Sequence, residues 1–148
     1  MPTDPIRAHL QEALKAVVAE EKQRLHEHYD RNDAIMAERV RMLHPLLELI
    51  RALQEELQPI PSITIGIAPH RHMATINLKG AAADHALSVA TDYGNTAFQV
   101  EEHVFYSFGA ESTERTHTFS NAEDAMRFLV AEVGKHIASL EVLRERKA

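Results

Sequence analysis

Histidine is the feature of this sequence that most directly suggests chemistry, because ten of the 148 residues are histidines. Its side chain is both the commonest metal ligand and a group that titrates near neutral pH. His70 and His72 stand two residues apart at the start of a predicted strand, so both imidazoles are expected on one face. These two are the best candidates in the sequence for ligands of a divalent transition metal. The sequence has no HExxH or similar signature to supply a third ligand, so structural or incidental histidines are the favoured interpretation.

Two further histidines fall in a predicted helix. His26 and His28 are two residues apart and therefore point in different directions, so they do not chelate one ion together. His26 and Asp30 have the workable four-residue spacing. A solvated helix face with an incidental ion pair is the favoured interpretation, because no third ligand is identifiable.

Glu102 interrupts the apolar side of a predicted strand, where Val100 and Val104 flank it. A buried carboxylate is costly unless it is paired, and a raised pKa beside His103 would suit acid–base chemistry or help a metal site. The favoured alternative is a β-bulge at Glu101 and Glu102, which would turn both carboxylates to water.

Catalytic signatures are otherwise missing. The sequence has no cysteine, which excludes disulfides and thiolate chemistry, and its five glycines form no phosphate-binding loop. No Ser, His and Asp arrangement nominates a nucleophile. The sequence therefore predicts a protein that is not an enzyme, with no catalytic residues and no cofactor beyond the metal considered above.

The N-terminal segment is predicted to be a long helix that begins at Asp4 and Pro5 and ends before Pro59. Pro45 is expected to cause a kink or a restart near residues 41–44. Large apolar residues recur near a 3.6-residue period, and the predicted dimerisation residues among them are Leu14, Val18, Leu25, Tyr29, Met36 and Leu43.

This helix is too long for one compact body. Residues 5–44 would extend about 60 Å at 1.5 Å per residue, against about 40 Å for a globule of this chain length. We favour pairing with a second copy, as in a coiled coil. The alternative is a helical hairpin that turns near residues 29–33.

From residue 62 the apolar period changes to two. Strands are predicted over 62–67, 72–78, 85–91, 96–108 and 115–119, and their short connections imply an antiparallel meander. Ser120 and Glu123 match a capping box before a last helix, which should cover one sheet face. The predicted fold class is α+β, with a helical arm over residues 1–58 and a sheet with its C-terminal helix over residues 59–148.

Charge and hydropathy limit the partners. The formal net charge is −6, and residues 59–119 carry three basic against six acidic groups, so nucleic-acid binding is disfavoured. A weaker alternative would use Arg24, Arg31, Arg39 and Arg41. No segment reaches the ~18 apolar residues of a membrane span, and the N-terminus lacks a secretory signal pattern, so we expect a cytoplasmic protein.

These features lead to a functional hypothesis. We expect a homodimer that binds or regulates another, unidentified protein as an adaptor, chaperone-like factor or inhibitor. The alternative is a small metal-dependent enzyme or sensor that uses His70 and His72, with Glu101, Glu102 or His103 nearby as companion residues. No family motif is identifiable in these residues.

Overall fold

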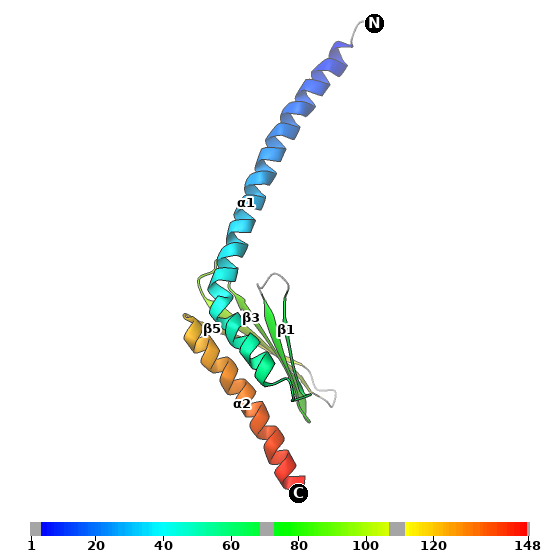
Figure 1. Ribbon diagram of the computed structural model, residues 1–148. Coiled ribbons are helices and arrows are strands. Elements are labelled where there is room, and N and C mark those ends of the chain that lie inside the picture. The colour runs from blue at the N-terminus through cyan, green and yellow to red at the C-terminus, as the bar shows by residue number, and fades with distance from the viewer. Residues whose placement is uncertain (1–3, 69–72, 107–111, 148) are drawn as a thin grey trace. The chain divides into compact units, whose positions relative to one another are not determined.

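The protein has an α+β architecture, as the sequence predicts (Figure 1). The computed structural model describes residues 4–68, 73–106 and 112–147. Its elements in chain order are α1 (Pro5–Glu56), β1 (Ile63–Ile67), β2 (Ala74–Lys79), β3 (Ala83–Thr91), β4 (Phe98–Tyr106), β5 (Thr113–Phe119) and α2 (Ala122–Lys147). The five strands form one antiparallel sheet in the order β1-β2-β3-β4-β5, because each connection is too short for a crossover.

Helix α1 is continuous over 52 residues. The Asp4 carboxylate accepts a hydrogen bond from the Ile6 amide at 3.0 Å and satisfies a donor at the helix start. The helix passes through residues 29–33 without a turn, so the single-helix prediction is confirmed and the hairpin alternative is wrong. It also continues through Pro45, where a restart was one expectation. Pro45 is exposed, so water can bond the carbonyl that the missing amide leaves unpaired.

Two compact units make up the chain, Met1–Ala37 and Glu38–Ala148. The division falls inside α1 and not after it, because the second part of this helix belongs to the core of the second unit. No helix among the described residues is long and apolar enough to cross a membrane.

Helices cover only one face of the sheet. The core joins the second part of α1 to α2 and to the inward-facing residues of all five strands, and Figure 1 shows both helices on the same side of the sheet. Its largest fully buried side chains are Leu43, Leu46, Ile50, Ile76, Leu87, Leu129, Val89 and Val100. The opposite face carries mostly small or polar side chains, among them Thr64, Thr75, Ser88, Gln99 and Thr118, and also the half-exposed Phe105.

A hydrogen-bonded turn between β3 and β4 fixes their register. Asp92 Oδ1 accepts hydrogen bonds from the amides of Thr96 at 2.6 Å and Ala97 at 3.0 Å. Bonds from the Thr96 side chain and these amides lower the pKa of Asp92. Asn95 takes a positive φ of 55°, which an Asn tolerates, and it binds the Thr91 hydroxyl at 2.7 Å. The turn thereby places the middle of β4 opposite the middle of β3.

The cap of α2 differs from the predicted capping box. Asn121 Oδ1 accepts a hydrogen bond from the Asp124 amide at 2.9 Å, and the helix begins at Ala122. The N-cap is therefore Asn121, and the prediction of Ser120 with Glu123 is wrong. Asn and Ser are equally good N-caps, so residue type alone did not decide between these two adjacent positions. The strand β5 ends at Phe119, as predicted, and α2 begins at Ala122.

Candidate functional site

Strand β4 carries three consecutive titratable residues that point to alternate faces of the sheet. Glu101 and His103 lie on the open face, and Glu102 lies on the face that the helices cover. The ladder to β3 and to β5 is uninterrupted across these positions. The predicted bulge at Glu101 and Glu102 is therefore wrong, and adjacent carboxylates have different surroundings.

On the face covered by the helices, Glu102 can stay in a regular strand because two imidazoles face its carboxylate. Its side chain is only 12% exposed, and its oxygens lie 3.7 Å from His85 Nδ1 and 3.5 Å from His117 Nε2. Both separations are long for hydrogen bonds, so the attraction is mainly electrostatic and depends on protonation of the imidazoles. The His117 ring packs against Phe128 of α2 with centroids 4.4 Å apart. These contacts offset the cost of burying the carboxylate.

A third imidazole on this face comes from α2. His136 Nε2 lies 2.9 Å from Ser62 Oγ, within hydrogen-bond distance. Burial lowers the pKa of His136, and the nearby His85 lowers it further. The group is therefore held in its neutral form over a wider pH range than a free histidine.

A cavity of about 740 Å³ lies between α2 and the β2–β3 connection. Its size is within the range of small-molecule sites. Its lining is mainly apolar, with polar groups from His85, Glu132, Lys135, His136 and Ser139. Lys135 is engaged with Glu132 at 3.1 Å.

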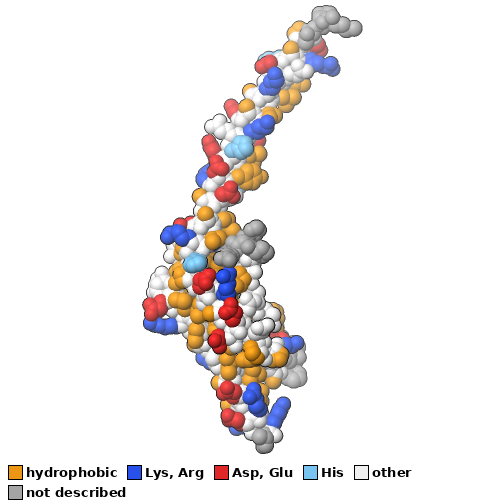
Figure 2. Space-filling model, viewed as in Figure 1, with side chains coloured by type: hydrophobic (Ala, Val, Ile, Leu, Met, Phe, Trp, Pro, Cys, Tyr) orange, Lys and Arg blue, Asp and Glu red, His pale blue; other side chains and the backbone are white. Residues whose placement is uncertain are grey.

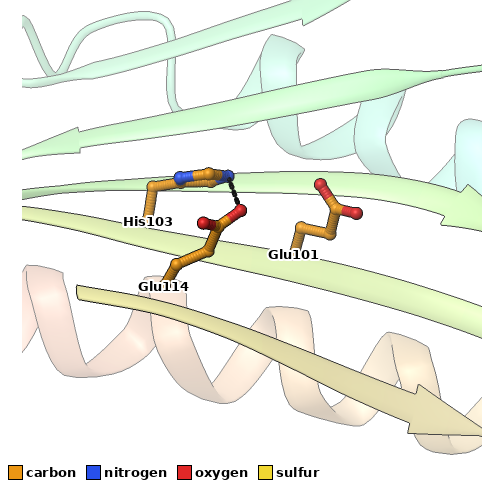
Figure 3. A group of neighbouring side chains, drawn as sticks. All are labelled: Glu101, His103 and Glu114. Carbon is orange, nitrogen blue, oxygen red and sulfur yellow. Dashed lines mark ion pairs between the residues drawn. The ribbon is translucent and has the colours of Figure 1, made fainter. Parts of the chain in front are cut away.

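On the open face, Glu101, His103 and Glu114 form a compact group (Figure 3). One ligand atom from each lies within 4.8 Å of the others, and His103 Nε2 is 3.4 Å from Glu114 Oε1. Glu114 reaches the group because it pairs directly with His103 across β4 and β5. An imidazole and two carboxylates at this spacing can ligate one divalent cation.

Only some of the residues predicted to bind metal lie in the part of the chain that the structure describes. His70 and His72 lie outside the described residues. Of the residues considered as their companions, Glu101 and His103 join the open-face group, whereas Glu102 is on the other side of the sheet. In α1, His28 lies 3.3 Å from the Asn32 side chain, and no ion pair joins His26 to Asp30 within the part of the chain described.

The first unit presents a second candidate site, an apolar stripe along α1 (Figure 2). Six of its eight members are about half exposed or more, from 49% for Val18 to 78% for Ile6, and Leu25 and Met36 are partly buried. We define the α1 stripe as Ile6, Leu10, Leu14, Val17, Val18, Leu25, Tyr29 and Met36. Leu43, also predicted for dimerisation, is fully buried in the core of the second unit and is left out of this surface.

The arginines of α1 are mostly engaged with neighbouring groups of the same helix. Arg24 pairs with Glu21 at 2.5 Å, Arg41 pairs with Glu38, and Arg31 Nε lies 3.4 Å from the Glu27 carbonyl. Arg39 Nε lies 3.4 Å from Asn95 Oδ1 of the β3–β4 turn. They do not form an uncompensated basic surface of the kind that phosphate binding needs.

The sequence prediction missed three residues that lie on strands other than β4. They are Glu114, which joins Glu101 and His103, and His85 and His117, which face Glu102. Glu114 was missed because the predicted strand begins at residue 115, whereas β5 begins at Thr113 and pairs Glu114 with His103. His85 and His117 alternate correctly with their neighbours to face inward, and this alternation was the available signal. Comparison with known protein families, curated proteins and solved structures finds no match for this chain.

Proposed function

We propose that the protein is a non-enzymatic protein-interaction module that acts as a homodimer joined through the α1 stripe. The observation that carries the proposal is the exposure of large apolar side chains along the first unit, where Leu14 is 55% and Val17 is 61% exposed. Scattered exposed apolar residues are normal, but a continuous stripe on one helix face marks an interaction surface.

The spacing of the α1 stripe supports a second copy as the occupant. Leu14, Leu25 and Met36 recur every 11 residues, and Val18 and Tyr29 repeat the same interval. An 11-residue repeat has about 3.67 residues per turn, which keeps the stripe on one side of a nearly straight helix. Two identical helices in register automatically match this repeat along their whole length.

The charges of the first unit also permit self-association. Residues 4–37 contain seven acidic and five basic side chains, so two copies do not carry a large like charge. A strongly charged helix would instead have required a partner of opposite charge.

The energies are consistent with reversible pairing. Full burial of one Leu, Ile or Val side chain is worth about 1.5–3 kcal/mol, and association costs about 4–15 kcal/mol in lost freedom. Five such residues, Ile6 to Val18, come from each copy. The free energy gained by partial burial of these side chains in both copies is similar to the free energy cost of association. Dimerisation is therefore expected to depend on concentration.

Light scattering coupled to size-exclusion chromatography tests this pairing. Wild-type protein is expected to show a dimer mass at high micromolar concentration, and the double variant Leu14→Glu with Val18→Glu is expected to be monomeric. Two carboxylates in the seam would be desolvated without partners. The unfolding transition of the second unit, followed by circular dichroism, should be the same in this variant as in the wild-type protein.

A charge-matched control separates the stripe from helix damage. Ala16→Glu with Gln23→Glu adds the same charge on the opposite side of the helix, where both residues are exposed. This variant should remain dimeric. A monomeric wild-type protein, or equal dimer loss in both variants, would contradict the proposal.

An adaptor, chaperone-like or inhibitory role extends this proposal to a second protein. The open face of the sheet supports it, because both helices pack on the other face and leave this one uncovered. Its mainly small and polar side chains, beside the half-exposed Phe105, suit a polar, reversible contact more than a permanent one. A pull-down with wild-type protein and the monomeric variant tests whether capture of a partner needs the dimer.

A further inference from the structure

We propose that Glu101, His103 and Glu114 form a binding site for a divalent first-row transition metal on the open face of the sheet. The inference does not rest on the α1 stripe, since all three residues belong to the second unit. The ligand atoms already lie within 4.8 Å of one another, so one ion can contact all three after side-chain rotation alone.

The strands hold the three ligands in place. Glu101 and His103 are two residues apart on β4, so they point to the same face, and Glu114 is directly opposite His103 on β5. Direct cross-strand neighbours have Cβ atoms about 4.5–5.5 Å apart. The backbone ladder therefore fixes the spacing of all three ligands, and little ordering remains for the ion to impose.

The surroundings leave both room and negative charge for a cation. On β3, the residues opposite His103 and Glu101 are Ala86 and Ser88, whose short side chains do not cover the group. Within residues 4–68, 73–106 and 112–147, no Lys or Arg forms an ion pair with Glu101 or Glu114. His103 alone faces two carboxylates, and a divalent ion would neutralise them.

The donor set indicates the class of metal. An imidazole nitrogen favours zinc and its first-row neighbours, whereas calcium and magnesium prefer all-oxygen sites. Three protein ligands leave further positions of the ion for water or for a group from a partner. We therefore expect Zn²⁺ to bind and Ca²⁺ and Mg²⁺ to bind much more weakly.

Calorimetry with Zn²⁺ on the full chain tests the site. We expect one Zn²⁺ per chain at this site. We expect His103→Ala or Glu101→Gln to raise the Kd for Zn²⁺ by more than about tenfold. In NMR spectra, the His103 imidazole resonances should shift on Zn²⁺ addition. Both variants should remain folded by circular dichroism, because the mutated side chains are outside the core.

A matched control comes from the exposed surface of α1. Glu27→Gln with His28→Ala removes one carboxylate and one imidazole and should leave the Zn²⁺ affinity unchanged. The monomeric Leu14→Glu with Val18→Glu variant should also bind Zn²⁺, so a failure of the dimer leaves this inference intact. No Zn²⁺ binding below about 1 mM, far weaker than dedicated sites, would overturn it. Undiminished binding by His103→Ala would overturn it as well.

Discussion

Three neighbouring residues of β4 show how alternation alone sets the chemistry of a side chain. Glu101 and His103 face the open side, where water and an added cation can reach them. Glu102 is turned beneath the helices, where its carboxylate faces His85 and His117. Like groups one residue apart therefore have different surroundings, and substitution of one should not reproduce substitution of another.

His136 makes the stability of the second unit depend on pH. Burial lowers its folded-state pKa below the ordinary value of 6.5, so the unfolded chain binds the proton more strongly. The free energy of unfolding should therefore fall as the pH drops from about 6.5 toward the folded-state pKa, and it should be fully regained above about 6.5. Urea unfolding between pH 8 and pH 5 measures this slope.

Two variants separate the titration of His136 from its contacts. His136→Gln should remove this part of the pH dependence. Ser62→Ala should lower stability through the lost hydrogen bond at 2.9 Å while the slope remains, because the imidazole still titrates. An unchanged slope in His136→Gln would contradict the assignment.

At the scale of elements, the start of α2 offers a direct comparison of two cap residues. Asn121 accepts the Asp124 amide, so Asn121→Ala should lower the free energy of unfolding by about 0.5–2 kcal/mol. Ser120 is exposed and makes no such contact among the described residues. Ser120→Ala should change stability by less than about 0.5 kcal/mol. Equal losses in thermal or urea unfolding would restore the predicted capping box.

Local patterns were sufficient to predict the elements themselves. The 3.6-residue period of the long helix and the two-residue period after Ser62 determine which elements form, and short connections determine that the sheet is antiparallel. The continuity of α1 through Pro45 was not predictable in this way. It follows from the tertiary contacts of Leu43, Leu46 and Ile50, which flank the proline and bury fully.

The candidate sites were predictable only in part, because they depend on cross-strand register. The sequence indicates that Glu102 falls among inward positions, yet only the ladder shows that His85 and His117 face it. The bulge was favoured because charged pairs commonly protect strand edges, whereas the two imidazole partners of Glu102 come from other strands. Glu114 joins His103 through the same kind of nonlocal pairing, which no spacing within one strand reveals.

At the scale of the whole molecule, both units carry a small acidic excess. Within the second unit, this excess is concentrated in the sheet segment 59–119, which has six acidic against three basic groups. An acidic sheet disfavours contact with phosphate backbones and favours cations. The proposed self-association and the proposed cation binding therefore belong to separate parts of the chain.

This separation predicts that the second unit folds without the first. Every fully buried core residue lies between Leu43 and Val133, and α1 supplies its share of the core from Leu43 onward. A fragment of residues 38–148 should therefore unfold cooperatively in urea, with a free energy of unfolding within about 1 kcal/mol of that of the full chain at a concentration where the latter is monomeric. It should be monomeric by light scattering and should bind Zn²⁺ with unchanged affinity. A dimeric fragment would place the interface on the second unit, and an unfolded fragment would show that residues 1–37 stabilise the sheet.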